Sequence, residues 1–559
     1  MALQRGARQQ AKAAPAATAG ALIGWLAIIW IPLWLLGTFI PGFEKAMNIL
    51  TKPLGLWFYV VLVVVSAALA LWKSPGDFLL ESIGKIFGGY YKTKNALTSS
   101  APVAVDPSAP PPFGLWLGKS TGIFANKGHF ASIAGGQDVV LGLSDACQNL
   151  IIFGGIGAGK TTRVINPLLV QALEQDCGGL IFDIKGDFKT GVYDLASRVN
   201  RAVVTVGPGS RPLNLLQGLT PEVSSSFLKS AFILGGGASG DNAFWVDTAT
   251  ELSRAGLGVL SFLPGEYSLE GLYRYLFNDR ERERMHQAAE LAKGDLDEKQ
   301  RRMLDSYLAY HRDIFSRFDD KVKAGVNATC AQVLSAFNLP DLVDSFCIDS
   351  PDAVNMEEVI NGSIILVDLP LPVYGLGAKV AYTFIKLRFM NVMQRRNTVP
   401  EWDKTRPVVF MCDEYQEIIS ASKSGLSDLN FWDKSRSSKC VGIVSTQSIA
   451  SFFAAIGDRD VSKAVMQNFR QKICFRSEDQ DTIETFSRLA GRVEVEKYSS
   501  STSQSKHGDS SSTSVSTREE DVLTAQLFRS LGASQAVALL SIDGIAMDDV
   551  LDLATVFTN

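Results

Sequence analysis

Histidine and cysteine are scarce in this chain, and neither is clustered. The 559 residues include four histidines and seven cysteines, and no C-x-x-C pair occurs. Metal sites bring several such residues together at short spacings, so no structural metal centre is predicted. No Ser/His/Asp or Cys/His arrangement for nucleophilic catalysis is recognisable either. The scattered cysteines, such as Cys412 and Cys440 in or beside apolar runs, are expected to be small core residues in a reduced compartment.

An excess of charge of one sign is also missing. Lysine and arginine number 54 and aspartate and glutamate 58, which gives a formal net charge of −4. No overall basic field therefore indicates nucleic acid, although a DNA channel needs only a local basic patch. The length alone predicts roughly three or four domains.

Two long apolar runs are present near the amino terminus. Residues 19–40 contain three tryptophans and no charged side chain, and residues 54–72 form a second run. Each is close to the ~20 residues that a membrane-spanning helix needs. Basic residues flank the outer ends of the pair, which predicts that both termini are cytoplasmic. We expect a transmembrane domain over residues 1–75; a cleaved signal peptide or a buried helix pair are the alternatives.

A complete G-x-x-x-x-G-K-[ST] motif, GGIGAGKT, occupies residues 154–161. An apolar run precedes it and a helical pattern follows, as a phosphate-binding loop requires. Glycines let backbone N–H groups converge on phosphate oxygens, Lys160 supplies a positive charge, and Thr161 offers a hydroxyl to Mg²⁺. A glycine-rich turn in a core would instead leave this lysine buried without a partner. The residues predicted to bind ATP and Mg²⁺ are Gly154, Gly155, Ile156, Gly157, Ala158, Gly159, Lys160, Thr161 and Thr162.

Two further apolar runs end in polar side chains suited to nucleotide hydrolysis. Residues 408–412 lead directly into Asp413 and Glu414, and residues 442–445 are followed closely by Gln447. Asp413 is expected to hold Mg²⁺ together with Thr161, and Glu414 to polarise the attacking water. Gln447 can hydrogen-bond the γ-phosphate or that water. Glu414 and Gln447 are therefore predicted to be catalytic.

Arg436 precedes the second of these runs by a few residues. A guanidinium from a neighbouring subunit would stabilise the negative charge that develops in phosphoryl transfer. Arg470 and Arg476 are competing candidates, because the sequence cannot place any arginine across a subunit interface. Arg436 is the predicted catalytic arginine.

Apolar runs alternate with helical patterns from residue 141 onward, which predicts an α/β fold with a parallel sheet covered on both faces. Residues 217–345 are helical in pattern and heavily charged, so they are predicted to form an all-α insertion that divides the nucleotide-binding domain into residues 141–216 and 346–559. Most of these charges are expected on solvated faces; recruitment of a partner is the alternative. Strands are expected at residues 150–153, 179–182, 202–206, 364–367, 408–412, 442–445 and 473–475.

Two segments have a biased composition. Residues 76–140 are expected to hold a juxtamembrane segment, a proline-rich linker and a small β-element. Serine and threonine dominate residues 498–517. The alternating residues on either side favour a long polar β-hairpin with its turn at residues 506–509, and a disordered linker is the alternative.

Taken together, these landmarks resemble the type IV secretion coupling proteins, the TraG/TraD-like ATPases of conjugation and effector export. That family belongs with the HerA/FtsK branch of RecA-like motors. The resemblance covers nearly the whole chain, and its motifs follow in the family's order. They are the paired apolar runs, the loop at 154–161, DIKGD at 183–187, PLNLL at 212–216, Phe244-Trp245, the Walker B pair Asp413-Glu414, Arg436, Gln447-Ser448 and residues 468–476 with 489–491.

This resemblance implies a RecA-like P-loop domain with an inserted all-α domain, held in the bacterial inner membrane as a hexamer. It implies an ATPase that drives substrate into a type IV secretion or conjugation channel, whose components would be its partners. The expected substrate is relaxase-bound single-stranded DNA, and protein effectors are the alternative. A FtsK/HerA-like DNA translocase and a non-hydrolysing membrane receptor or scaffold are the other hypotheses. No L-S-G-G-Q-like signature occurs, which disfavours an ABC-type transporter half.

Overall fold

The computed structural model describes residues 113–236, 243–422, 425–505 and 508–558. The predicted transmembrane domain, the juxtamembrane segment and the proline-rich linker lie outside these residues. Within the described ranges, no helix has both the length and the apolar character needed to cross a bilayer.

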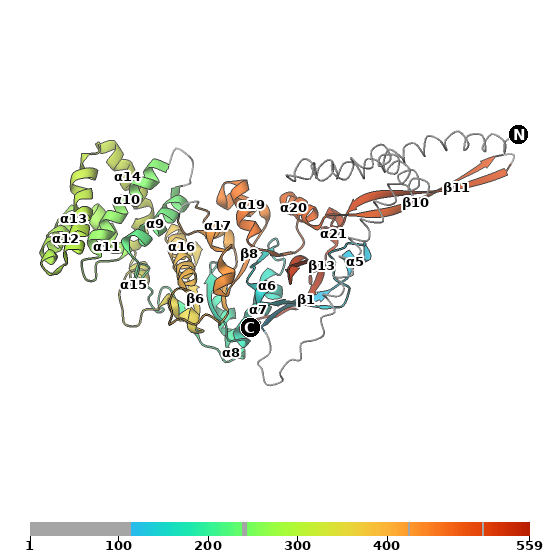
Figure 1. Cartoon of the computed structure of the whole chain (residues 1–559), viewed down its shortest axis with the longest axis horizontal. Helices are drawn as coiled ribbons and strands as arrows, with labels where there is room; N and C mark the ends of the chain where they lie inside the picture. Colours follow the sequence, from blue (N-terminus) through green and yellow to red (C-terminus); the bar gives the residue numbers. More distant parts are fainter. Residues whose placement is uncertain (1–112, 237–242, 423–424, 506–507, 559) are drawn as a thin grey trace, which may run out of the picture. The chain divides into compact units, whose positions relative to one another are not determined.

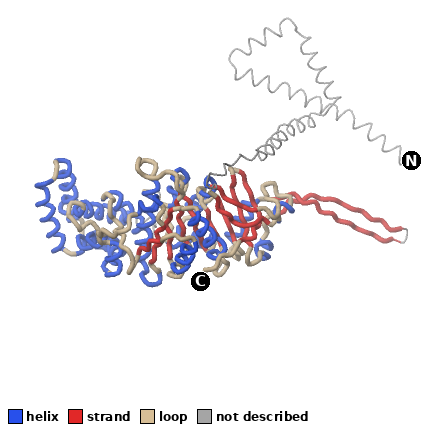
Figure 2. Tube along the Cα trace, turned by 90° about the horizontal axis from the view of Figure 1, so that it is seen from below, coloured by secondary structure: helices blue, strands red, loops and turns tan. Residues whose placement is uncertain are grey.

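A mixed sheet of 11 strands runs through the described residues (Figures 1 and 2). Across the sheet, the strand order is β2 (Asp138–Gly142), β1 (Gly114–Ser120), β13 (Ile545–Leu553), β12 (Gln535–Ile542), β9 (Gln471–Cys474), β3 (Leu150–Phe153), β8 (Cys440–Thr446), β7 (Val408–Cys412), β4 (Gly178–Asp183), β6 (Ile364–Asp368) and β5 (Val203–Val206). The first four strands are antiparallel to their neighbours, and the seven strands from β9 to β5 are parallel to one another.

The parallel part of the sheet coincides with the strands predicted from apolar runs. Such runs form where helices cover both faces of a strand, which is the situation of β3, β4, β7 and β8. The sheet as a whole differs from the predicted parallel one because four antiparallel strands extend it. Of these, β1 and β2 come from the expected small β-element, and β12 and β13 come from the C-terminal end of the described chain.

Successive residues of the central strands enter two separate cores, because side chains alternate across a sheet. Ile151 and Phe153 of β3 belong to one core, and Leu150 and Ile152 belong to the other. Helices α16 (Leu371–Arg395), α18 (Ile449–Ile456) and α20 (Gln480–Ala490) contribute to the first core. Helices α7 (Asn166–Glu174) and α8 (Lys189–Arg198) contribute to the second.

Between β5 and β6 the described residues contain helices and no strand (Figure 1). We call residues 217–345 the helical insertion. Its α-helices are α9 (Pro221–Gly236), α10 (Ala243–Leu260), α11 (Leu269–Phe277), α12 (Asp279–Ala292), α13 (Glu298–Ala309), α14 (Asp320–Leu334) and α15 (Pro340–Phe346).

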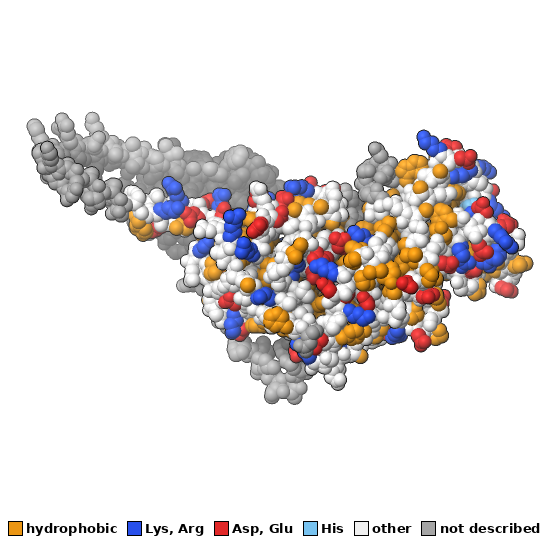
Figure 3. Space-filling model, turned by 180° about the vertical axis from the view of Figure 1, so that it is seen from behind, with side chains coloured by type: hydrophobic (Ala, Val, Ile, Leu, Met, Phe, Trp, Pro, Cys, Tyr) orange, Lys and Arg blue, Asp and Glu red, His pale blue; other side chains and the backbone are white. Residues whose placement is uncertain are grey.

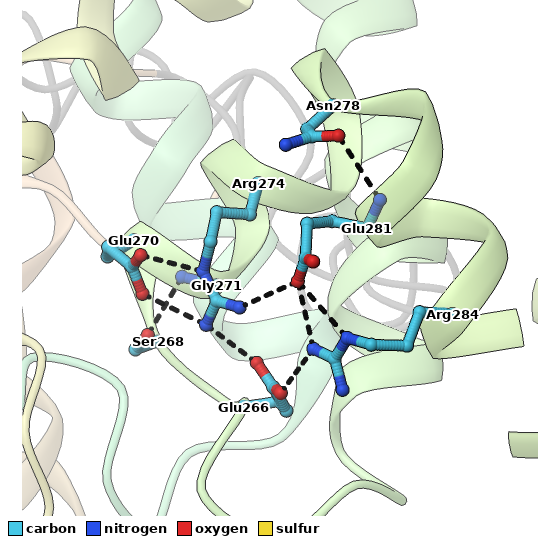
Figure 4. A network of polar contacts seen from close by, with 8 residues as sticks. All are labelled: Glu266, Ser268, Glu270, Gly271, Arg274, Asn278, Glu281 and Arg284. Carbon is cyan, nitrogen blue, oxygen red and sulfur yellow. Dashed lines mark hydrogen bonds and ion pairs between the residues drawn. The ribbon is translucent and has the colours of Figure 1, made fainter. Parts of the chain in front are cut away.

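Charged side chains of the helical insertion pair with one another around α11 and α12 (Figure 4). Arg274 lies 2.7 Å from both Glu266 and Glu270 and 3.2 Å from Glu281. Arg284 joins Glu266 at 2.8 Å and Glu281 at 3.0 Å. Positive and negative side chains also lie side by side on the face seen in Figure 3. This local pairing favours the expected solvated charge surface.

The Ser/Thr-rich segment forms the predicted hairpin. Strands β10 (Arg492–Ser505) and β11 (Gly508–Asp521) pair with each other from Arg492↔Asp521 to Ser505↔Gly508. They form a separate two-stranded sheet, visible as a long ribbon in Figure 2. The alternating residues 492–496, which favoured the hairpin, form the start of β10.

Candidate functional site

Four neighbouring parallel strands, β3, β8, β7 and β4, bring the predicted site residues other than Arg436 to one edge of the sheet. Residues 154–161 follow β3, Asp413 and Glu414 follow β7, and Gln447 lies just beyond β8. Carboxyl ends of parallel strands meet at one edge, where open α/β folds bind their ligands. The topology therefore converts motifs that are far apart in the sequence into one cluster.

The phosphate-binding loop adopts a conformation that its glycines allow. Gly157 and Gly159 have φ values of +72° and +92°, a region that side chains with a Cβ rarely enter. Lys160 is only 7% exposed, and its Nζ donates a hydrogen bond of 2.7 Å to the carbonyl of Gly154. Burial lowers the pKa of Lys160, against the raising influence of Asp413 and Glu414. The ammonium group is thus held within the loop.

Asp413 and Thr161 are in direct contact. The Thr161 hydroxyl donates to Oδ2 of Asp413 at 3.1 Å, and the Ser445 hydroxyl donates to Oδ1. The Glu414 backbone N–H also donates to Oδ1, at 3.0 Å. A hydroxyl and a carboxylate side by side are hard oxygen donors of the kind that Mg²⁺ prefers. These residues therefore fit a magnesium ion that is shared with nucleotide phosphates.

No larger metal cluster accompanies this pair. Among the residues that the structure describes, no group of three or more His, Cys, Asp or Glu side chains is arranged to hold a metal ion. Magnesium in nucleotide sites takes only one or two protein ligands, and phosphates and water complete its shell. A Thr/Asp pair is enough for that role.

Glu414 is almost completely buried, at 4% exposure, in a left-handed backbone conformation with φ 55° and ψ 46°. Its carboxylate accepts hydrogen bonds from Lys185 at 2.5 Å, Gln416 at 2.5 Å and Gln447 at 3.2 Å. Burial acts to raise the pKa of this carboxyl group, but the donors and the charges of Lys185 and Lys160 bring it below its usual value. Glu414 is therefore ionised at neutral pH and can accept a proton.

Lys185 belongs to the DIKGD segment at residues 183–187, and the sequence alone indicates no role for it. Asp183 shapes this turn, since its carboxylate accepts the backbone N–H groups of Gly186, Phe188 and Lys189 at 2.8, 3.0 and 2.7 Å. The turn directs Lys185 toward Glu414. The one sequence feature that could have indicated this contact is the position of Lys185, two residues beyond β4. Only the strand order of the sheet shows that β4 lies next to β7.

The structure does not bring Arg436 to the loop of the same chain. Arg436 lies before β8, and its guanidinium donates to the Ser144 hydroxyl at 2.6 Å, in a segment that precedes β3. Because β3 and β8 are parallel, this is the opposite edge of the sheet. Arg470 likewise precedes β9, whereas Arg476 follows β9 and lies beside the loop.

Two cavities flank the loop. One, of about 840 Å³, is lined by residues that include Gly155–Gly159, Thr162, Gln447, Arg476, Leu531–Ala533 and Gln535. The other, of about 230 Å³, is lined by Thr161, Lys185 and Asp413 among others. The larger volume lies within the range of small-molecule sites. Space for a ligand is therefore present on the loop's exposed side.

Comparison with known proteins agrees with this geometry. Residues 407–533 match the family model described as the TraM recognition site of TraD and TraG. Family-model match and fold together confirm the resemblance to type IV coupling proteins. No curated protein matches the sequence.

The fold is similar to that of coupling-protein structures at low sequence identity. The bacterial conjugative coupling protein TrwBdeltaN70, in an unbound form, has 14% identity over 75% of this chain and 89% of that chain, with a TM-score of 0.54. Plasmid coupling protein TrwB with the GTP analogue GDPNP has 15% identity over 81% and 97%, with a TM-score of 0.54. TrwB with ADP and Mg²⁺ has 14% identity over 74% and 87%, with a TM-score of 0.53. These values show a shared fold.

Proposed function

We propose that this chain is an ATP-hydrolysing coupling protein that drives substrate into a type IV secretion or conjugation channel. The observation that carries the proposal is the cluster at the carboxyl edge of the sheet. Thr161 touches Asp413 at 3.1 Å, and Glu414 accepts hydrogen bonds from Lys185 and Gln447. The TrwB structures with GDPNP or with ADP and Mg²⁺ support the assignment of a nucleotide to this edge.

Each residue of the cluster has a distinct part in hydrolysis. Backbone N–H groups of residues 154–161 and the Lys160 ammonium bind the β- and γ-phosphates. Thr161 and Asp413 would hold Mg²⁺, which when bound neutralises charge on the phosphates. The ionised Glu414 orients a water molecule and accepts its proton, and Gln447 donates a hydrogen bond to that water or to the γ-phosphate. Lys185 keeps Glu414 ionised and in place.

The wider assembly is part of the same proposal. Residues 1–75 would anchor the chain in the inner membrane, and the nucleotide-binding part would form a hexamer in the cytoplasm. The expected substrate is single-stranded DNA with its relaxase, because the matched structures are conjugative and plasmid coupling proteins. Channel components and a TraM-like protein are the expected partners, the latter from the model that matches residues 407–533.

Two variants of the full chain, reconstituted in lipid, test the proposal. Lys160→Ala should abolish retention of labelled ATP, because the loop loses its only lysine. Glu414→Gln should retain ATP but release phosphate about 10²–10⁴-fold more slowly, the usual contribution of a general base. Nucleotide binding and phosphate release are measured separately, with and without single-stranded DNA.

The outcomes separate the competing functions. Wild-type turnover stimulated by single-stranded DNA, together with loss of plasmid transfer in both variants, supports DNA coupling. Turnover that responds to effector protein and not to DNA would move the assignment to protein export. Translocation guided by DNA orientation would favour a FtsK-like translocase. Absence of turnover in the wild type under every condition would leave only a receptor or scaffold.

A further inference from the structure

A fully buried ion pair lies behind the candidate catalytic residues. Nζ of Lys386, on α16, is 2.5 Å from Oδ2 of Asp428, and both side chains are completely shielded from solvent. Burying two charges is costly, and well-packed apolar residues often stabilise a core as well or better. Stability alone therefore does not account for this pair.

The hydrogen bonds of the pair converge on the segment that follows Glu414. Lys386 also donates to the backbone carbonyl of Ile418 and, at 3.1 Å, to the hydroxyl of Ser420. Asp428 accepts the Ser420 backbone N–H at 2.6 Å and the Tyr415 hydroxyl. A cation and an anion thus bind the same six-residue stretch at three residues, Tyr415, Ile418 and Ser420.

Tyr415 connects this network to Glu414 directly. Its side chain is fully buried, and its hydroxyl also accepts a 2.9 Å hydrogen bond from the indole N–H of Trp432. Its ring lies against those of Phe410 and Phe469, with centroids 6.1 Å away in each case. The residue after Glu414 therefore has little freedom to move.

Glu414 needs such restraint because its backbone is in a conformation that non-glycine residues rarely adopt. A left-handed φ at a residue with a side chain costs free energy and persists only where the surroundings enforce it. On the amino-terminal side, β7 and the Asp413 carboxylate fix the backbone. On the carboxyl-terminal side, the Tyr415 network does so. Between them, the Glu414 carboxylate is directed at Lys185 and Gln447.

We propose that Tyr415, Asp428 and Lys386 are positioning residues that hold Glu414 in its reactive conformation. The proposal rests on the proposed ATP hydrolysis, in which Glu414 handles the attacking water. None of the three would touch the nucleotide. They act through the backbone of residues 414–420, and a small displacement of a catalytic group lowers the rate of the chemical step without changing substrate binding.

The first test is Tyr415→Phe, which removes one hydroxyl and keeps the ring. We expect kcat for ATP hydrolysis to fall about 10- to 100-fold, the scale of a catalytic group misplaced by about 1 Å, while KM and the Kd of a fluorescent ATP analogue stay within about twofold. The matched control is Tyr275→Phe in the helical insertion. Tyr275 is also fully buried, and its hydroxyl lies 2.8 Å from Nε2 of His286. The Tyr275→Phe variant should lose as much stability as Tyr415→Phe and keep wild-type kcat.

The split between kcat and nucleotide binding is the readout that a merely structural role would not move. The Tyr275→Phe variant should keep wild-type kcat, KM and Kd for the ATP analogue. A Tyr415→Phe enzyme with wild-type kcat would overturn the proposal.

The ion pair is tested by the double variant Lys386→Met/Asp428→Asn, which leaves no unpaired charge in the core. It should fold, bind ATP with wild-type affinity and show the same fall in kcat as Tyr415→Phe. Normal kcat in the folded double variant would show that the pair is dispensable for positioning. If the wild type itself hydrolyses no ATP, the proposed function fails instead, so the two failures are distinguishable.

Discussion

The ionisation of the Glu414 carboxylate is set by the residues that donate hydrogen bonds to it. Burial alone would favour the protonated form, and Lys185 reverses this preference by hydrogen bonding and by charge. Nothing in the local sequence of residues 408–414 contains this information. It arises because β4 and β7 are neighbours and the turn after β4 is closed by Asp183.

Replacing Lys185 by methionine should therefore raise the pKa of Glu414. Hydrolysis needs the ionised carboxylate, which is present at high pH. As the pH falls, the Lys185→Met variant should therefore lose its activity at a higher pH than the wild type does. The expected result is a shift of the acid limb of kcat toward neutrality, measured by phosphate release across pH. Lys189→Met is a matched control, because Lys189 pairs with Asp368 at 2.7 Å instead. An unchanged acid limb in Lys185→Met would contradict the assigned role.

Helix α16 lies between the catalytic edge and the helical insertion. It carries Lys386 toward the segment after Glu414, and Phe384 on the same helix contacts Phe227 of α9 with ring centroids 5.9 Å apart. Near its start, Gly377 packs so closely that an added Cβ would lie 2.8 Å from atoms of both Ala336 and Leu342. The contact between α16 and the insertion leaves no room for a larger side chain.

Gly377→Ala should accordingly destabilise the protein by about 1–3 kcal/mol, the usual cost of overpacking a core. The free energy of unfolding is measured by denaturant titration followed by circular dichroism. Gly294→Ala is the matched control, because a Cβ there meets no atom within 4 Å. It should be neutral or slightly stabilising, by up to about 1 kcal/mol. Equal effects of the two substitutions would show that the contact at α16 is loose.

At the scale of elements, apolar runs identified every parallel strand, because strands covered on both faces need continuous apolar sequence. The antiparallel strands β12 and β13 were not predicted. Polar and charged residues such as Asp548 and Asp549 interrupt β13. These carboxylates are buried, and distant loop residues bond them: the Gly122 N–H donates to Asp549, and His129 lies within hydrogen-bond distance of Asp548. Those partners are more than 400 residues away along the chain.

For the whole molecule, the opposite positions of Arg436 and the loop have a direct consequence. Arg436 lies at the amino ends of the parallel strands, and the loop lies at their carboxyl ends. A chain therefore cannot use its own Arg436 on its own nucleotide, but in a ring the amino ends of the strands in one copy could face the loop of the next copy. This arrangement agrees with the prediction that Arg436 acts in a neighbouring subunit.

Mixing two inactive variants in lipid tests that prediction. Lys160→Ala lacks nucleotide binding but keeps Arg436, and Arg436→Ala has the converse defect. Each alone should show little phosphate release. In an equal mixture, roughly a quarter of the interfaces would join an intact loop to an intact arginine, so activity should reappear. The control is a mixture of either single variant with the double variant Lys160→Ala/Arg436→Ala. No recovery in the mixture would exclude a role for Arg436 across the interface.

The sequence by itself determined the local chemistry: the loop at residues 154–161, the acids after residues 408–412, the glutamine after the next strand and the polar hairpin. Short motifs and strand patterns suffice for these, since the turn conformations that glycine allows and the apolar pattern of a strand are properties of residues close together in the sequence. Tertiary structure alone decided that Lys185 meets Glu414, that Lys386 and Asp428 support Tyr415, and that Arg436 lies at the far edge. Such contacts depend on strand order and helix packing, which many distant residues determine together.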